Sequence, residues 1–317
     1  MEPKVPTRYP VICGPTAGGK SSLALDVVRR LGELGHEAEL VSADAYQVYR
    51  RMDIGTAKPE AAELAAVPHH LVDIVEPEET FTLAQWLGLA EAAIADIKSR
   101  GRVPIVVGGT HLYIKSLMDG LFQGPDPDPA IRAELSAMPI QALRAELERD
   151  DPEAADRIHP NDQRRTIRAL EVFRQTGQTI SSLQTQWDSE HPRDPGRFLV
   201  VLGWEASAIN SRINARVKEM KAMGLLAEAK ALHEADSLGQ TAGQALGYKQ
   251  LVAHFKGRCT EEEAFEQIKI ETRRFAKNQR TWLRRLQSSP GSIGLSPADF
   301  DPKNMIQLVV NTMFTTI

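Results

Sequence analysis

The segment Gly14–Ser21 reads GPTAGGKS and fits the phosphate-binding pattern G-x-x-x-x-G-K-[ST]. Backbone N–H groups of such a loop close around phosphate oxygens, and the lysine, here Lys20, reaches the terminal phosphates. The hydroxyl of Ser21 is a ligand for Mg²⁺. The pattern predicts a polyphosphate site but does not choose between ATP, GTP and another diphosphate. Its residues are Gly14, Pro15, Thr16, Ala17, Gly18, Gly19, Lys20 and Ser21.

Asp44 follows a second apolar segment and is the acidic group expected closest to the phosphate loop. Ligands of open α/β sheets bind at the carboxyl ends of the strands, so Asp44 can face that loop. Three roles remain open for it: a partner of Mg²⁺, a general base, or an N-cap of the next turn. The following stretch, Asp53–Pro59, has the composition of an exposed loop, in which Lys58 would be solvated.

Gly108 and Gly109 follow a third apolar segment and permit close approach of a ligand, while Thr110 can donate to a phosphate or a base. A glycine pair of this kind is equally often only a tight turn. The adjacent His69 and His70 point in different directions on a strand or a helix. No second pair stands at metal-ligand spacing, so the sequence predicts no zinc site.

Two basic stretches are candidates for contact with nucleic acid. Arg164, Arg165 and Arg168 lie three and four residues apart, on one side of a predicted helix, although solvation alone explains many such charges. Between Phe265 and Leu286 there are seven basic residues and two acidic ones. A basic helical face with an aromatic residue suits an RNA backbone, but a lone tryptophan is more often part of a core. That face comprises Lys269, Arg273, Lys277, Arg280 and Arg284, with Trp282 among them.

The elements that must position these residues alternate between strands and helices. Short runs rich in β-branched residues predict buried strands at Pro10–Cys13, Ala38–Val41, Val103–Val107 and Phe198–Leu202. Helical periodicity lies between them, over Ser21–Leu34 and Leu83–Ser99. This alternation predicts an α/β fold with a parallel sheet covered on both faces.

The composition divides the chain further. Residues 1–123 form the first part of the core, and GPDPDP at Gly124–Pro129 opens a strand-poor, helical insertion over residues 124–196. Residues 197–286 return to the core and end in the basic helices. Residues 287–317 have no functional interpretation from sequence.

Charge, cysteine content and hydropathy narrow the class of protein. The net charge is −4, so an RNA site must be a local basic patch on an acidic background. Two cysteines, Cys13 and Cys259, exclude a disulfide framework and suit a reducing cytosol. No apolar run reaches the roughly 20 residues that span a bilayer, and the first ten residues lack the layout of a signal peptide. We therefore expect a cytoplasmic protein.

The chain resembles one family over residues 10–286: the bacterial tRNA dimethylallyltransferases, also called tRNA isopentenyltransferases. An ordered series of segments carries the resemblance, and SADxxQVY, DIGTAKP and PHHLxD in this order are specific to the family. The segments are GPTAGGKS (14–21), SADAYQVYRRMDIGTAKP (42–59), PHHLVDI (68–74), GRVPIVVGGTHLY (101–113), HPNDQRRTIRALEV (159–172), QALGYKQ (244–250) and AKNQRTWLRR (276–285).

The resemblance implies a P-loop core with an inserted helical domain that grips the anticodon stem-loop of tRNA. The exocyclic amine of the adenine just 3′ of the anticodon would attack the allylic carbon of dimethylallyl diphosphate, and diphosphate would leave. ATP hydrolysis is not part of this reaction. By resemblance Asp44 is the general base, Thr110 lies beside the adenine, and Arg216 acts with Lys20 near the diphosphate. We expect Mg²⁺ as cofactor and a monomer.

The same resemblance implies a set of tRNA contacts. These are Asp44, Ala45, Tyr46, Gln47, Thr110, Arg132, Gln163, Arg164, Arg165, Thr166, Ile167, Gln244, Ala245, Leu246, Gly247, Tyr248, Lys249, Lys277, Asn278, Gln279, Arg280, Thr281, Trp282, Leu283 and Arg284. The sequence departs from the family pattern at Ala45, where serine is expected, and at Asn278, where arginine is expected. The first departure removes a hydroxyl and the second a positive charge.

Two other functions fit parts of the sequence. A small-molecule kinase would use ATP in the phosphate loop but leaves the C-terminal basic stretch unexplained. An RNA-binding ATPase would explain both features. Either would be favoured by an apolar run ending in a metal-binding aspartate, and the only candidate is Asp44. The sequence does not say which tRNAs would be modified or in which order the substrates bind.

Overall fold

The structure is a computed structural model that describes residues 6–122, 124–184, 196–288, 291–297 and 301–315. The chain divides into two compact units, one spanning Asp119–Pro192 and the other formed by the residues before and after it. The smaller unit overlaps most of the expected insertion 124–196. No described helix is long and apolar enough to cross a membrane.

The larger unit contains a parallel sheet of six described strands in the order β3-β2-β4-β1-β5-β6. From β1 the chain forms β2 and β3 on one side, returns to β4, and crosses to the other side for β5 and β6. The predicted α/β fold is thus confirmed. The strands are β1 (Tyr9–Cys13), β2 (Ala38–Ala43), β3 (His69–His70), β4 (Val103–Gly108), β5 (Arg197–Leu202) and β6 (Ile293–Leu295).

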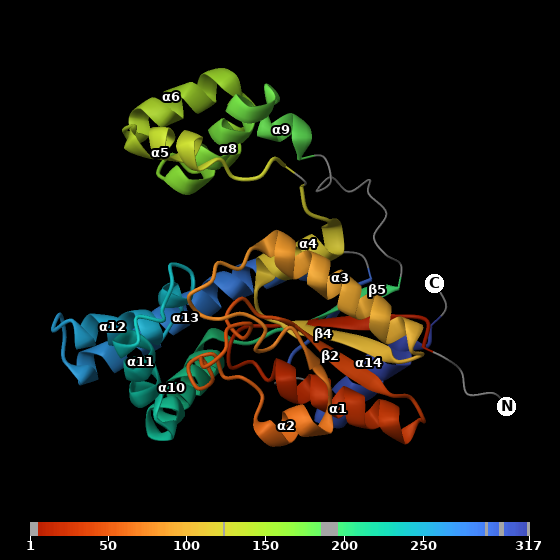
Figure 1. Cartoon of the computed structure of the whole chain (residues 1–317). Helices are drawn as coiled ribbons and strands as arrows, with labels where there is room; N and C mark the ends of the chain where they lie inside the picture. The colour runs from red at the N-terminus through yellow and green to blue at the C-terminus, as the bar shows by residue number, and fades with distance from the viewer. Residues whose placement is uncertain (1–5, 123, 185–195, 289–290, 298–300, 316–317) are drawn as a thin grey trace. The chain divides into compact units, whose positions relative to one another are not determined.

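Helices cover both faces of the sheet. One face carries α1 and α14, which pack on each other, and the other carries α3 and α4 (Figure 1). Each of these helices buries one apolar stripe; in α3 it comprises Trp86, Ala90, Ile94 and Ile97. The bounds of these helices are α1 (Lys20–Glu33), α3 (Leu83–Ser99), α4 (His111–Asp119) and α14 (Pro302–Met313). A further short helix, α2, spans Ala61–Ala66.

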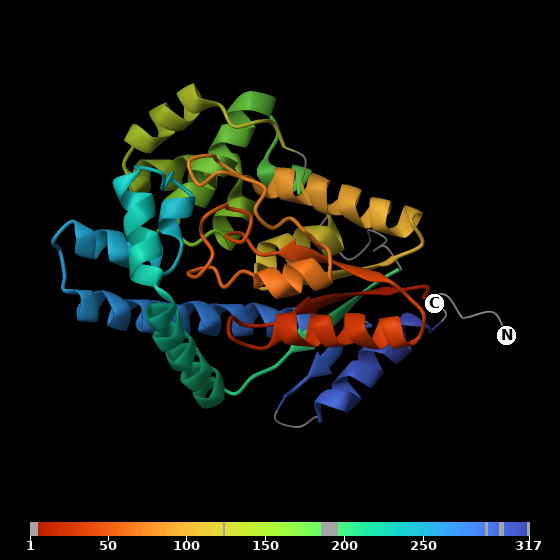
Figure 2. The same ribbon diagram turned by 60° about the horizontal axis from the view of Figure 1, so that its bottom comes forward.

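A second helical group lies beyond the carboxyl ends of the strands (Figures 1 and 2). It has its own apolar core, in which Tyr49, Met52, Ile213 and Tyr248 are fully buried. The group consists of α10 (Ala206–Met223), α11 (Leu225–Glu234), a 3₁₀ turn η2 (Ala242–Gln244), α12 (Tyr248–Phe255) and α13 (Glu261–Gln287). Thr260 caps α13, and its first turn is acidic while its last is basic, which complements the helix dipole.

The C-terminal residues belong to the core of the larger unit. Strand β6 pairs with β5, and α14 buries Met305, Val309, Val310 and Met313. These residues were left without an interpretation because β6 has only three residues, too few for a strand pattern to be recognised in the sequence.

The smaller unit is helical. Its core is built around Leu135, Leu143, Leu147 and Leu170, which are essentially fully buried. The carboxylate of Glu171 is also buried and accepts hydrogen bonds from the side chains of Arg132 and Arg168. The helices are α5 (Pro129–Ala137), α6 (Ile140–Asp150), α7 (Pro152–Arg157), α8 (Gln163–Thr176) and α9 (Ile180–Leu183).

Candidate active site

The phosphate loop joins the end of β1 to the start of α1, and three side-chain donors bind its carbonyl groups. Lys20 Nζ donates to the Pro15 carbonyl oxygen at 2.9 Å. From outside the loop, the indole N–H of Trp204 donates to Gly18 O at 3.0 Å, and Arg212 Nε donates to Ala17 O at 2.7 Å. These three carbonyl groups of the loop already accept hydrogen bonds. N–H groups of the loop and of the start of α1 remain to bind an anion, as expected for this motif.

Gln279 connects the phosphate loop to the loop that follows β4. Its Oε1 accepts a 2.9 Å hydrogen bond from the Thr16 amide, and its Nε2 donates to Gly109 O at 2.8 Å. A Cβ at Gly109 would lie 2.7 Å from this amide nitrogen, so the close approach requires glycine. The side chain of Gln279 is only 2% exposed. Helix α13 therefore sets the spacing between the two loops.

Asp44 stands at the carboxyl end of β2 with one carboxylate oxygen held and the other free. Oδ1 accepts hydrogen bonds from the amides of Tyr46 (2.9 Å) and Gln47 (3.4 Å). Oδ2 accepts none from the residues that the structure describes. Thr110 lies next to it, because its hydroxyl oxygen accepts the Ala45 N–H at 3.0 Å. The bound oxygen orients the carboxylate, and Asp44 lines a cleft in which its free oxygen can accept a proton.

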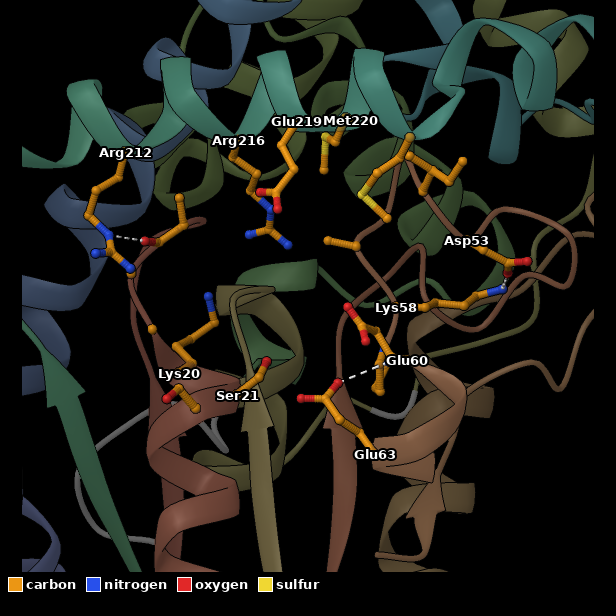
Figure 3. Close-up of a pocket in the computed structure, with 18 of the residues that line it drawn as sticks. Lys20, Ser21, Asp53, Lys58, Glu60, Glu63, Arg212, Arg216, Glu219 and Met220 are labelled. Carbon is orange, nitrogen blue, oxygen red and sulfur yellow. Dashed lines mark hydrogen bonds and ion pairs between the residues drawn. The ribbon is translucent and has the colours of Figure 1, made fainter. Parts of the chain in front are cut away.

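Three adjoining clefts meet at this edge of the sheet, with volumes of about 810, 460 and 310 Å³. Arg216 lines all three. The largest cleft contains Ser21 and the first turn of α1, and the second is lined by Asp44, by apolar groups of α10 and by Phe275. Lys20 and Arg216 point from opposite sides into the same space (Figure 3). We call the three clefts together the reaction cleft.

Two cations of this cleft, Lys20 and Arg216, form no salt bridge with the residues that the structure describes, although Asp44 lies near enough to affect the pKa of each. Burial is the main cause that lowers the pKa of Lys20 to about 8; Asp44 opposes this shift, and the nearby charge of Arg216 adds to it. Burial also lowers the pKa of Arg216. Arg216 makes no hydrogen bond or ion pair with the described residues. Desolvated cations of this kind are stabilised when an anion binds between them.

The segment 53–59 lines the same cleft and is fixed from both sides. The carboxylate of Glu228 accepts the amide N–H groups of Asp53 (2.9 Å), Ile54 (2.8 Å) and Gly55 (3.1 Å). The side-chain amide of Gln47 donates to the carbonyl oxygens of residues 56 and 57. This segment is therefore held in one conformation at the side of the cleft.

The expectation that Lys58 is solvated was wrong. Its side chain is 3% exposed, and its ammonium group contacts the carboxylates of Asp53 and Asp73 and the carbonyl oxygen of Tyr49. Composition suggested a loop open to water, but the buried ammonium pairs with two acids and organises the turn around itself. The histidine pair likewise has a structural partner, since His70 Nε2 lies 2.7 Å from the buried carboxylate of Glu39.

The residues expected to contact tRNA fall into three groups. Buried within their own units are Thr166, Ala245, Gly247, Tyr248, Gln279 and Leu283. Ala245, Gly247 and Gln279 nevertheless line the reaction cleft. Half-buried are Asp44, Ala45, Tyr46, Gln47, Thr110, Ile167, Leu246, Arg280 and Trp282. Exposed are Gln163, Arg164, Arg165, Gln244, Lys249, Lys277, Asn278, Thr281 and Arg284, while Arg132 pairs with Glu171.

The basic face of α13 is only partly available. Lys269 pairs with Glu266, Arg273 donates to Asn214 Oδ1 at 2.6 Å, and Arg280 contacts the Trp204 carbonyl oxygen at 3.4 Å. Lys277 and Arg284 are exposed. Trp282 is half-buried and stacks on His111 with ring centroids 4.8 Å apart. The helical spacing was thus right, but three of the five cations also serve internal contacts.

Three residues of the site, Trp204, Arg212 and Glu228, were not predicted from the sequence. Arg212 carried a weak signal, because it precedes Arg216 by one helical turn and shares its side of α10. Trp204 and Glu228 carried none, because each contacts its partner only across the tertiary structure, over 186 and 173–175 residues of chain.

The fold and the site define a P-loop protein with half-buried cations beside a carboxylate at the carboxyl edge of the sheet. Residues 47–286 match the family model described as IPP transferase. The chain is 44% identical to the tRNA dimethylallyltransferase 1 of Citrifermentans bemidjiense, covering 86% of this chain and 88% of the relative. It is 43% identical to the tRNA dimethylallyltransferase of Bacillus licheniformis, with 88% of each chain covered.

Solved structures indicate the same family as the sequence relatives do. The tRNA isopentenylpyrophosphate transferase of Bacillus halodurans is 35% identical, with a TM-score of 0.69 over 97% of each chain. A eukaryotic dimethylallyltransferase, described as acting on tRNA, has a TM-score of 0.78 at 27% identity, over 91% of this chain and 74% of that one. This chain belongs to the IPP transferase family.

Proposed function

We propose that this protein is a tRNA dimethylallyltransferase, a prenyltransferase that moves the five-carbon group of dimethylallyl diphosphate to N6 of the adenosine just 3′ of the anticodon. The observation that carries the proposal is that two desolvated cations, Lys20 and Arg216, share one cleft with the free carboxylate oxygen of Asp44. The cations suit a diphosphate leaving group, and the carboxylate suits a proton acceptor. Membership of the IPP transferase family supports the same reaction.

The donor half of the site would bind the diphosphate. Backbone N–H groups of Gly19, Lys20 and Ser21, the ammonium of Lys20 and the guanidinium of Arg216 would surround its oxygens. As the bond to the allylic carbon breaks, negative charge grows on the leaving group, and cations already in place stabilise it without reorganisation. An anion would also relieve the burial of both cations, so binding and charge stabilisation use the same groups.

A magnesium ion fits the donor set on this side of the cleft. The exposed Ser21 hydroxyl and the carboxylate of Asp44 line one cleft, and hydroxyl and carboxylate oxygens are ligands that Mg²⁺ prefers when a substrate phosphate supplies the others. When bound, the ion would neutralise diphosphate charge. Asp44 could hold this ion or act as the base. Because its Oδ1 is already held by two amides, we assign Oδ2 to the proton.

The acceptor half would hold the adenine. Its amine is a weak nucleophile, because its lone pair is delocalised into the ring. As the N–C bond forms, the nitrogen becomes acidic and its proton passes to Asp44 Oδ2. The Thr110 hydroxyl oxygen accepts a hydrogen bond from the Ala45 N–H. The hydrogen of the hydroxyl therefore remains free to bind the adenine. Extrusion of the adenine from the anticodon loop would cost a few kcal/mol, which contacts to the flanking RNA would offset.

The substrates would approach from different sides. The largest part of the cleft, along the first turn of α1, would take the diphosphate end of the donor. The second part, bordered by Gln244, Arg274 and Asn278, would admit the RNA. Asp44 and Arg216 border this second part too, so the reacting atoms would meet there. We propose that the protein works as a monomer, because all of these groups come from one chain, and in the cytoplasm, because its two cysteines suit a reducing compartment.

The test is a paired turnover assay with Mg²⁺ and an anticodon stem-loop RNA that carries adenine just 3′ of the anticodon. One sample contains labelled dimethylallyl diphosphate and the other labelled ATP. We expect prenyl label in the RNA, and its loss in Asp44→Ala. ATP turnover stimulated by RNA, without prenyl transfer, would refute the proposal and favour an RNA-dependent ATPase. ATP turnover that needs no RNA would favour a kinase.

A further inference from the structure

A basic hollow lies beside the reaction cleft, on the far side of Gln244. Its volume is about 440 Å³, and its lining residues come from α11, the segment between α11 and η2, η2 itself, α12 and the turn after α12. Three of them are cations, Lys249, Lys256 and Arg258, and Asp236 is the one carboxylate among the described lining residues. None of these three cations forms a salt bridge with the residues that the structure describes. We call this site the basic hollow.

The position of the lysines on α12 favours a ligand over a role in helix stability. Lys249 and Lys256 are seven residues apart, so they lie two turns apart on one face, with Val252 and Ala253 between them. Lys256 caps the carboxyl end of α12, where the helix dipole favours a cation. Lys249 is in the first turn, where the dipole disfavours one. The dipole therefore explains one lysine and leaves the other unexplained.

The backbone at Arg258 and the ring of His233, which both line the hollow, are held in place by neighbouring residues. The turn after α12 is closed by hydrogen bonds from Arg258 N to Ala253 O (3.0 Å) and between His254 Nδ1 and Cys259 O (2.9 Å). The ring of His233 stacks on Phe255, with centroids 5.6 Å apart. Three exposed cations on one ordered surface repel each other, and an anion that binds among them removes this repulsion.

The basic hollow is continuous with the proposed RNA side of the reaction cleft. Gln244 lines both, and Lys249 follows the 244–247 segment that borders the cleft. Because the two sites share Gln244, an RNA strand whose adenine occupies the cleft could continue into the hollow. Backbone phosphates are the anions that such a strand presents, and Lys and Arg are the residues that neutralise them.

We propose that the basic hollow binds a backbone phosphate of the RNA next to the reacting nucleotide, with Lys256 and Arg258 as its new contacts. The proposal rests on the proposed function, because it takes the anion from the RNA substrate. Its ligand chemistry, a phosphate group, is shared with free inorganic phosphate, and the experiment below separates the two.

The experiment compares Lys256→Ala/Arg258→Ala with a matched control, Arg29→Ala/Lys303→Ala. The control removes the same charge from exposed positions on α1 and α14, at the other end of the larger unit (Figure 1). Binding of a labelled anticodon stem-loop is measured by fluorescence anisotropy between 50 and about 300 mM salt. Circular dichroism verifies that all variants fold.

We expect the hollow variant to bind RNA roughly 10-fold or more weakly at 0.1 M salt, and its plot of log affinity against log salt to be shallower by about 2, near one for each cation removed. The control variant should match the wild type. With saturating RNA, the turnover of prenyl transfer should stay unchanged while KM for RNA rises. An unchanged salt slope in the hollow variant, or an equal change in the control, overturns the proposal.

Calorimetry with inorganic phosphate, without RNA, completes the test. Phosphate binding that is lost in the hollow variant, while the RNA salt slope remains that of the wild type, would assign the hollow to free phosphate and overturn the RNA contact. The anisotropy measurement needs no turnover. A wild-type protein that binds RNA through the hollow but transfers no prenyl group would therefore refute the proposed function and leave this proposal intact.

Discussion

The Glu228 carboxylate on α11 accepts a 2.5 Å hydrogen bond from the Tyr248 hydroxyl on α12, directly beneath the segment 53–59. The same carboxylate holds the N–H groups of residues 53, 54 and 55. A Cβ at Gly55 would lie 2.4 Å from the Tyr248 ring, so the backbone rests against the aromatic face. Burial, and the negative charge of Glu228 next, raise the pKa of Tyr248 well above its ordinary value, which keeps the hydroxyl a donor.

This relationship predicts that Glu228 positions the 53–59 segment without touching substrate. In Glu228→Gln one oxygen becomes an NH₂ group that faces backbone donors, so we expect a loss of about 1–3 kcal/mol in the free energy of unfolding. Displacement of the segment should lower kcat by up to about 10²-fold. Urea unfolding and steady-state kinetics are the measurements.

Tyr248→Phe is the matched control for Glu228→Gln, because it removes one of the four hydrogen bonds and leaves the ring in place. It should lower kcat less than Glu228→Gln does. Affinity for RNA should remain that of the wild type in both variants. If kcat is unchanged in Glu228→Gln while stability falls, Glu228 only supports the fold and has no positioning role.

Asp44→Asn tests the assignment of the proton acceptor. The remaining oxygen still accepts the Tyr46 and Gln47 amides, so the local turn should persist, but the NH₂ group cannot take a proton. We expect kcat for prenyl transfer to fall by about 10²–10⁴-fold. Affinity for RNA, measured by anisotropy, should change little. Glu219→Gln, an exposed carboxylate of the same cleft, should stay near wild type, and an equal loss there would contradict a specific role for Asp44.

The pKa of Lys20, lowered to about 8, predicts a pH dependence of donor binding. The ammonium loses its proton as the pH rises through 8, whereas a bound diphosphate favours the charged form. Affinity for dimethylallyl diphosphate should therefore fall above pH 8, by up to about 10-fold per pH unit. Calorimetry between pH 7 and 9.5, without RNA, measures this slope. In Lys20→Met binding should be weak at every pH and the slope lost, so a slope that survives the substitution would point to another group.

The lowered pKa of Lys20 also predicts a pH dependence of stability. The stability contribution of Lys20 should rise with pH, whereas the affinity for dimethylallyl diphosphate should fall. Its pKa is lower in the folded chain than the ordinary 10.5, so the unfolded chain binds more protons between pH 8 and 10.5. The contribution of Lys20 to the free energy of unfolding therefore rises with pH across this window. Urea unfolding of the wild type and of Lys20→Met at pH 7 and 10 isolates this contribution. Relative to the wild type, the variant should be more stable at pH 7 than at pH 10.

Gln279→Leu tests the bridge between the phosphate loop and the β4 loop. The substitution leaves the Thr16 N–H and the Gly109 carbonyl without their partner in a buried place, which should cost about 1–3 kcal/mol of stability for each group. KM for the donor should also rise, because the phosphate loop loses its spacer. Asn278→Ala, an exposed neighbour, should change stability by less than about 0.5 kcal/mol. Wild-type stability in Gln279→Leu would exclude a structural bridge.

The sequence by itself determined the phosphate loop, the four principal strands and the acid after β2. Each depends on neighbours in the chain: a glycine-rich loop needs its strand and helix at once, and Asp44 follows β2 directly. The family also followed from the order of short segments. Local patterns of this kind are legible because secondary structure and turn chemistry act over a few residues.

The tertiary structure alone decided how those pieces are held. Gln279 was expected at the RNA surface, yet it is buried between two loops 263 and 170 residues away. Lys58 was expected in water, yet it forms ion pairs with two carboxylates. Glu228 had no signal at all. Hydrogen-bond partners and counter-charges for buried polar groups come from any part of the chain, so residue type and spacing cannot reveal them before the chain has packed.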